Sequence, residues 1–238
     1  MKKFLPLVVL IATLTFVLSP LASTVFNGFT PNQFPVVQND PPVQPAGYAF
    51  SIWGLIFTWL MVGAGYGFWR ASDDPGWQAM RLPLAASLII GTFWIAAANT
   101  APILATVMII AMAVLAILAV LRAGHRQPWF QVRPVALYAG WLTAASGVGI
   151  GVLLGGYAIL SAQSAATLCL IGVLVVALTV QSARPREWGY PAAVVWALVG
   201  VIVQNLTTSN WTVIILAAFS IVALISRTLF SVMKGPST

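Results

Sequence analysis

Tryptophan is the residue type whose number and placement point most directly to a chemical role. The chain holds 10 tryptophans among 238 residues. Those that fall inside long apolar runs, where an indole N–H needs a hydrogen-bond partner, are Trp53, Trp59, Trp94, Trp141 and Trp196. Aromatic rings with a few polar groups inside a helical bundle can form a pocket for a flat apolar ligand. Simple packing explains each ring equally well when it is considered alone.

Side chains that catalyse hydrolysis or bind metals lie outside the apolar runs. Asp73, Asp74, Glu187 and the only histidine, His125, fall between runs, so no carboxylate pair is placed for acid–base catalysis and no base for a serine nucleophile. Cys169 is the only cysteine, which excludes an internal disulfide and a multi-cysteine metal site. Proton-driven antiporters and voltage sensors keep charges within the membrane. The sequence leaves enzymatic activity open but favours its absence.

The composition requires a membrane. Hydrophobic residues make up 60% of the chain and charged residues only 6%, against roughly 25% charged residues in a soluble domain. So few charges cannot cover a water-soluble fold of this size. The net charge is +7, but the basic residues are scattered singly without a basic stripe, which argues against nucleic-acid binding. We therefore expect the partners to be membrane lipids and a hydrophobic small molecule.

The apolar runs set the fold class. A bilayer core of roughly 30 Å needs about 20 apolar residues per helix. Runs without Asp, Glu, Lys, Arg or His cover residues 4–26, 47–69, 82–98, 102–121, 134–160, 166–180, 189–205 and 211–226. Pro102, Pro134 and Pro191 lie near the starts of three runs, where a missing N–H costs nothing. The sequence predicts an all-α integral membrane protein with about eight transmembrane helices.

The positive charges predict the orientation of these helices. All 11 lysines and arginines lie before the first run, after the last, or in alternate connections, whereas segments 27–46, 99–101, 161–165 and 206–210 hold none. Because cytoplasmic loops collect Lys and Arg, both termini are predicted to be cytoplasmic. We expect a multi-pass protein of a bacterial inner membrane.

The first run has a second interpretation as a signal peptide, with Lys2 and Lys3 as its basic region. Leu21-Ala22-Ser23 is a poor cleavage site, and the run stays apolar through Phe26, so we expect the helix to be retained. Cleavage would leave seven helices in the same orientation.

Small residues recur at helical spacing in the fifth run. Gly147, Gly151 and Gly155 form a doubled GxxxG pattern, which lets another backbone approach closely. We expect a crossing with another helix of the same chain; a homodimer is the alternative.

The only long loop, residues 27–46, contains five prolines, which restrict a chain to extended and turn conformations. Such a loop in a compact protein is commonly a lid or a binding loop. It leads directly into the segment Tyr48-Ala-Phe50-Ser-Ile-Trp53. The loop is therefore predicted to cover a site at the start of the second run.

This segment resembles a signature of the TspO/MBR family of tryptophan-rich sensory proteins, roughly Pro-Pro-x-Trp-x-Phe-x-Pro-x-Trp-Thr-x-x-Tyr. Pro45, Phe50 and Trp53 match it, whereas Tyr48 replaces its first tryptophan and Phe57 its tyrosine.

A second segment, 134–145, is similar to the family's fifth helix. Pro134, Tyr138 and Trp141 match there, but Ser146 lies near the position of the family's asparagine, a departure that affects a polar ligand contact. A weaker resemblance to the family's turn between helices 3 and 4 runs from Trp94 to Pro102.

The resemblance implies a five-helix membrane core over residues 1–160, followed by a three-helix extension over 161–238. It also implies a pocket in the core, closed by the proline-rich loop, that binds porphyrin, haem, or a sterol- or carotenoid-like molecule. The residues that it assigns to the ligand are Tyr48, Phe50, Trp53, Trp94, Asn99, Tyr138 and Trp141.

Three classes of function follow from these observations. A sensor or regulator that binds a ligand would have a tight aromatic pocket. A transporter of small amphipathic solutes would have a path through the bundle, and a structural subunit of a membrane complex would have a solidly filled core.

Overall fold

The structure is a computed structural model that describes residues 4–22 and 28–233. Its described residues form helices and no strands. The eight α-helices are α1 (Phe4–Leu18), α2 (Ile52–Trp69), α3 (Pro75–Thr100), α4 (Pro102–Arg122), α5 (Val132–Gly156), α6 (Ala162–Ala183), α7 (Gly189–Leu206) and α8 (Trp211–Met233). Three short 3₁₀ helices are η1 (Ser19–Ala22), η2 (Pro31–Gln33) and η3 (Gly47–Ser51). All eight segments are long and apolar enough to span a membrane, which confirms the predicted fold class.

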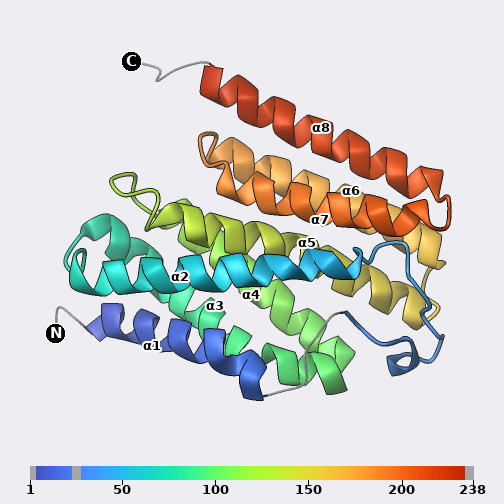
Figure 1. The fold of residues 1–238 in the computed structure, drawn as a ribbon, viewed down its shortest axis with the longest axis horizontal. Coiled ribbons are helices and arrows are strands. Elements are labelled where there is room, and N and C mark those ends of the chain that lie inside the picture. Colours follow the sequence, from blue (N-terminus) through green and yellow to red (C-terminus); the bar gives the residue numbers. More distant parts are fainter. Residues whose placement is uncertain (1–3, 23–27, 234–238) are drawn as a thin grey trace.

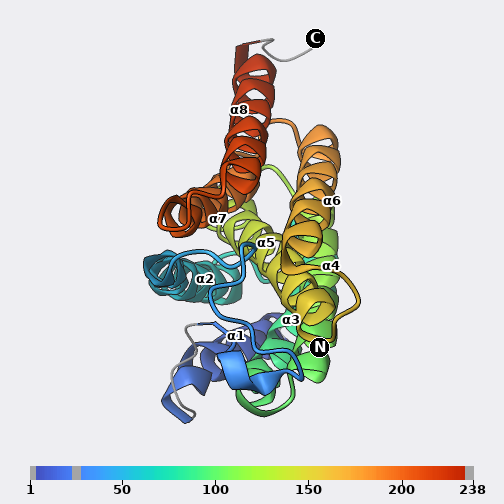
Figure 2. The ribbon, with the colours of Figure 1, turned by 90° about the vertical axis from the view of Figure 1, so that its right-hand side faces the viewer.

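Helix α5 lies at the centre of the bundle. It packs against α2 and α4 and also against α6 and α7, and Figure 2 shows it between these helices when the bundle is viewed end-on. Most of its residues are buried, whereas α1 and α8 lie at opposite margins. Helices from both predicted parts thus share one core around α5. The division at residue 160 stays a prediction.

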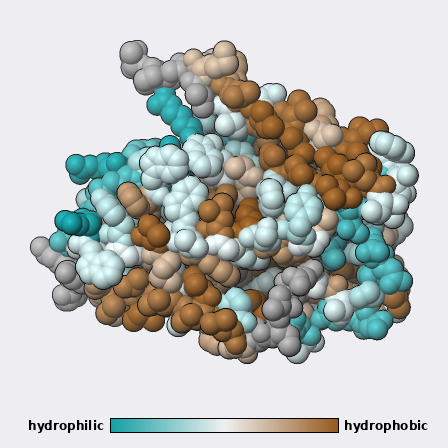
Figure 3. Space-filling model, in the orientation of Figure 1, coloured by the Kyte–Doolittle hydropathy of each residue, from teal (hydrophilic) through white to brown (hydrophobic). Residues whose placement is uncertain are grey.

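The two ends of the bundle differ in charge. α1 begins and α8 ends at the same end, on the left in Figure 1, and every described arginine lies near that end. We call it the arginine end, and the opposite one, which carries residues 28–46, the loop end. On the face seen in Figure 3, hydrophobic patches lie at the upper right and the lower left, residues of intermediate hydropathy lie between them, and hydrophilic residues gather toward both ends. Which side of the membrane each end occupies stays a prediction.

Helix α3 begins earlier than the apolar run that predicted it. The Asp74 carboxylate accepts hydrogen bonds from the backbone N–H groups of Gly76 and Trp77, and Pro75 occupies the first turn, so a capped start lies seven residues before the run. Arg81, expected at the edge of a loop, is therefore inside the helix and buried. The prediction that this arginine lies in the connection between two helices is wrong, and Arg122, Arg133 and Arg227 also fall within the bounds of α4, α5 and α8.

The glycine pattern of α5 serves two purposes. A Cβ at Gly147 would lie 2.4 Å from Cγ2 of Val173 in α6, so this glycine lies at a close helix crossing. A Cβ at Gly151 or Gly155 would instead meet Val43 or Gln38 of the long loop, at 3.0 and 2.9 Å. The predicted crossing with a helix is thus correct for Gly147 only, because the other two glycines make room for the loop. The homodimer stays a prediction.

Candidate functional site

The long loop lies across the loop end and is fastened to several helices. Its Val36 N–H donates to the carbonyl of Gly156 at the end of α5 (2.9 Å), and the Gln33 amide donates to the carbonyl of Ala98 in α3 (2.9 Å). The Phe34 ring packs so closely on Gly156 that a Cβ there would lie 2.6 Å from it. The loop is therefore a packed part of the fold.

Helix α7 holds the part of the loop that leads into α2. The Asn205 amide donates to the Pro42 carbonyl (2.8 Å), and the indole N–H of Trp196 donates to the Ala49 carbonyl (2.8 Å). The Ala46 N–H donates to the carbonyl of Gly200 (3.0 Å), where a side chain would collide with Ala49. A helix from the C-terminal third of the chain thus fixes the start of η3 and α2.

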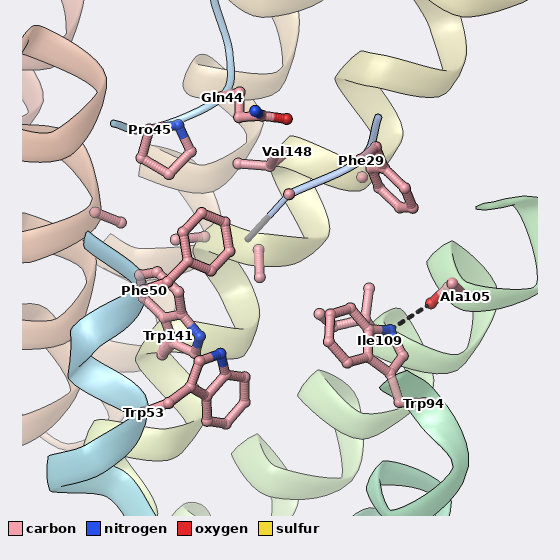
Figure 4. A pocket seen from close by; sticks show the side chains of 15 residues that line it. Phe29, Gln44, Pro45, Phe50, Trp53, Trp94, Ala105, Ile109, Trp141 and Val148 are labelled. Atoms are coloured by element: carbon pink, nitrogen blue, oxygen red, sulfur yellow. Dashed lines mark hydrogen bonds between the residues drawn. The ribbon is translucent and has the colours of Figure 1, made fainter. Parts of the chain in front are cut away.

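A cavity lies beneath this loop, between α2, α3, α4, α5 and α7 (Figure 4). Its lining is almost entirely apolar. The residues that line it are Gly28, Phe29, Gln44, Pro45, Phe50, Trp53, Trp94, Ala105, Ile109, Trp141, Ala144, Ala145, Val148, Gly149 and Ala197. An apolar lining with few polar groups is typical of pockets for small hydrophobic molecules.

Aromatic rings form two walls of the cavity. On one side, Trp141 meets Phe50 and Trp53 edge-to-face, with ring centroids 5.8 and 6.1 Å apart. These are favourable aromatic geometries that hold each ring in place. Trp94 lies on the opposite side, where its indole N–H donates to the carbonyl of Ala105 (2.9 Å) (Figure 4). A flat apolar molecule between the walls would contact ring surfaces on both sides.

Two polar atoms of the lining are buried without a hydrogen-bond partner in the described part of the chain. They are Nε1 of Trp141, a donor on a residue that is only 2% exposed, and Oε1 of Gln44, an acceptor. A buried group left unsatisfied costs about 1–3 kcal/mol. A ligand with an acceptor facing Trp141 and a donor facing Gln44 would satisfy both.

The cavity is small. Its volume is about 40 Å³, which exceeds the ~10–15 Å³ that one water needs but is far below the ~300–1,000 Å³ of pockets for drug-sized ligands. A neighbouring hollow of about 390 Å³, which we call the outer hollow, lies on the other side of the same rings, between α1, η3, α2 and α3. Phe50, Trp53 and Trp94 line both. The two spaces therefore share one aromatic wall.

The structure brings four of the seven predicted ligand residues to the cavity: Phe50, Trp53, Trp94 and Trp141. Tyr48 is 45% exposed, lines the outer hollow and packs edge-to-face on Trp196.

The remaining two predicted residues lie outside the cavity lining. Tyr138 is fully buried below the cavity, with its hydroxyl 3.0 Å from that of Ser87. Asn99 is half-buried near the end of α3.

Sequence reasoning missed most of the other lining residues, among them Phe29, Gln44 and Ala197. The first two belong to the proline-rich loop, which was identified only as a whole. The signal for α7 was Asn205, a polar residue at the end of an apolar run, which would have indicated a polar contact at that end of the helix.

An aromatic layer separates this cavity from the arginine end. Phe16 of α1 contacts Trp53 and Tyr138, with centroids 5.9 and 5.6 Å apart. A smaller cavity of about 20 Å³, lined by residues such as Leu60 and Arg81, lies beyond them. Within the described residues, no group of three His, Cys, Asp or Glu side chains comes together to hold a metal ion.

Comparison with known proteins gives one match. A family model described as a TSPO-like protein matches residues 5–230, and no curated protein or solved structure matches the chain. The match extends through α6, α7 and most of α8, the helices that the resemblance had left outside the family core.

Proposed function

Because the chain belongs to the TSPO-like family, whose members are membrane proteins of the sensor and binding type, we propose that it is a sensor or regulator that binds a flat apolar ligand. The ligand is a porphyrin or another tetrapyrrole, or a sterol- or carotenoid-like molecule. It binds between the aromatic walls beneath the long loop. The observation that carries the proposal is an apolar cavity whose two unsatisfied polar atoms, on Trp141 and Gln44, lie among aromatic rings.

Ligand entry requires the site to open, because the closed cavity is much smaller than a tetrapyrrole. The outer hollow supplies the route. It is lined by residues of α1, η1, η3, α2 and α3 and shares three aromatic residues with the cavity. Movement of η3 and of the Phe50 and Trp53 rings would then couple ligand binding to the loop, which is how binding becomes a signal.

The transporter reading is less well supported. A transporter needs a path from one end of the bundle to the other. Here Phe16, Trp53 and Tyr138 pack together between the aromatic cavity and the smaller cavity toward the arginine end. A structural subunit would have a filled core. The small apolar cavity, with two polar atoms that lack a hydrogen-bond partner in the described residues, favours ligand binding instead.

Trp53→Ala is expected to weaken porphyrin binding about tenfold. Ring stacking contributes roughly 1–3 kcal/mol per contact, and ~1.4 kcal/mol is tenfold in affinity. Titration by tryptophan-fluorescence quenching in detergent measures the dissociation constant. Trp211→Ala is the control, because Trp211 is exposed at the start of α8 and should leave the affinity unchanged.

Circular dichroism checks that both variants remain folded. Equal porphyrin affinity in the wild type and Trp53→Ala would move the site elsewhere, and a wild type that binds no porphyrin would reject a tetrapyrrole as the ligand.

The orientation proposed is that both termini and the arginine end are cytoplasmic, with the loop end external. It rests on the gathering of the described arginines at one end. A reporter fused after Thr238 should be active only in the cytoplasm, and one inserted near Asn32 only outside. Reporters that respond on the same side would contradict the eight-helix topology.

A further inference from the structure

A different hollow lies at the arginine end, away from both the aromatic cavity and the outer hollow. It has a volume of about 800 Å³ and lies between the end of α4, the start of α5 and the connection from α6 to α7. Its charged lining residues are Arg133, Arg184, Arg186 and Glu187, and His125 lies beside them. Three arginines there face one carboxylate. The hollow is therefore net positive.

Arg133 is fixed in place but is not satisfied. Its guanidinium carbon lies 4.1 Å from the ring centroid of Trp129 and 5.6 Å from that of Trp188, so the two indoles hold it by cation–π contacts. Its side chain is 18% exposed, yet Nε and Nη1 are buried and have no hydrogen-bond partner in the described residues. The nearest carboxylate oxygen, on Glu187, is 3.8 Å from Nε, which is too far for a hydrogen bond.

Arg184 is oriented by the opposite wall. One of its terminal nitrogens donates to the backbone carbonyls of Leu121 and Ala123 at the end of α4, and the other lies 3.2 Å from Nε2 of His125. This arrangement ties the two connections together and fixes a positive charge on the wall. Arg186 is exposed at the rim.

Among the described residues that line the hollow, Glu187 is the one negative group. Its burial raises the pKa of the carboxyl to about 7, although Arg133 and Arg184 both act to lower it. One of its oxygens is buried without a hydrogen-bond partner in the described chain. The carboxylate therefore does not neutralise the arginines efficiently.

We propose that this hollow binds a phosphate group, which Arg133 and Arg186 contact directly while Arg184 supplies a fixed charge. Guanidinium groups bind phosphate oxygens in bidentate geometry, and the free N–H groups of Arg133 lack such a partner. The apolar wall formed by Leu121 and Val132 continues into the membrane-spanning part of the bundle. This position favours the headgroup of an anionic lipid as the source, because basic pockets between helices at a membrane surface bind such headgroups.

Native mass spectrometry of the full-length protein tests the proposal. The protein is titrated in detergent at pH 8, where Glu187 is ionised, with phosphatidylglycerol and with phosphatidylcholine of the same acyl chains. The wild type should retain phosphatidylglycerol preferentially. Arg133→Gln and Arg186→Gln should each weaken its binding about fivefold, the effect of one basic residue near an anionic lipid surface.

Two further variants give the experiment its specificity. Glu187→Gln should tighten phosphatidylglycerol binding severalfold, because it removes the negative charge that the described lining places in the hollow. Arg70→Gln is the matched control, since Arg70 is exposed at the same end but outside the hollow, and it should bind like the wild type. A loss of folding in Arg133→Gln would leave Arg186→Gln and Glu187→Gln as the decisive pair.

Competition with inorganic phosphate separates the two sources of the group. Displacement of phosphatidylglycerol by millimolar phosphate would support the phosphate site and identify a soluble phosphate as its ligand. Retention of the lipid under these conditions would identify the lipid headgroup. Equal phosphatidylglycerol retention by the wild type, Arg133→Gln, Arg186→Gln and Glu187→Gln would overturn the proposal.

Discussion

One methyl group added at Gly140 is expected to destabilise the folded protein by about 3 kcal/mol, the upper part of the range for an overpacked core. A Cβ at this position in α5 would lie 2.2 Å from the carbonyl oxygen of Tyr190 and 3.1 Å from Cβ of Ala193 in α7. The nearest atom belongs to the backbone, so no side chain can rotate away. α5 and α7 would have to separate.

The matched control is Gly172→Ala in α6, where an added Cβ has no neighbour within 4 Å. Alanine is favoured over glycine in a helix by about 1 kcal/mol, so this variant should be as stable as the wild type or more so. Thermal unfolding in detergent, followed by circular dichroism and size-exclusion chromatography, compares the variants. A Gly140→Ala protein that unfolds at the wild-type temperature would contradict the close α5–α7 crossing.

This crossing also supports the aromatic cavity. Trp141 follows Gly140 in α5, and α7 contributes Ala197 to the lining and Trp196 and Asn205 to the anchoring of the loop. A shift of α7 away from α5 would therefore change the cavity and the loop together. Porphyrin binding by Gly140→Ala should fall in parallel with its stability.

The helices were predictable because a membrane span is set by composition and length. A run of about 20 apolar residues has few alternatives in a bilayer, and the alternation of basic and uncharged connections was consistent with the count. The start of α3 was not predictable from apolar runs, because a scan of this kind stops at the first charge. The sequence Asp74-Pro75 was the available signal, since it is typical of a capped helix start.

The aromatic wall was predictable in part. Phe50, Trp53 and Trp141 occupy positions of the family signatures, and each reaches the cavity. Tyr138 belongs to the same signature but lies three residues, or about 4.5 Å along the helix axis, deeper than Trp141. Its hydroxyl is hydrogen-bonded to that of Ser87, so it belongs to the aromatic layer beneath the cavity and not to the lining.

The partners of α7 could not be predicted from the sequence, although Asn205 indicated a polar contact at the end of this helix. Trp196 and Ala49 are hydrogen-bonded although 147 residues separate them, and no local pattern reports a contact at that distance. Tyr48 illustrates the same limit. It lies in the 3₁₀ helix η3, and its ring packs against Trp196 instead of turning into the cavity.

Removal of the Arg81 side chain should cost as much stability as the change at Gly140, for an electrostatic reason. Arg81 is 2% exposed and donates hydrogen bonds to the carbonyls of Gly67 (2.9 Å), Ala71 (2.8 Å) and Ser72 (2.8 Å). These carbonyls lie at the end of α2 and in the turn after it. Carbonyls at a helix C-terminus lack partners within the helix, and the negative end of the helix dipole lies there. One guanidinium therefore satisfies three backbone acceptors and explains why a charge is tolerated inside α3.

Arg81→Met keeps most of the apolar volume but leaves the three carbonyls without their donor. At about 1–3 kcal/mol for each unsatisfied buried group, and with partial rescue by water at this end of the bundle, a loss of about 3 kcal/mol or more is expected. Arg81→Lys should lie between Arg81→Met and the wild type, because an ammonium keeps the charge but lacks the planar fork that reaches several acceptors at once. Arg70→Met, at an exposed position on the same end of α2, should unfold at the wild-type temperature. If Arg81→Met and Arg70→Met unfold at the same temperature in detergent, the three hydrogen bonds do not hold α2 to α3, and the buried charge needs another explanation.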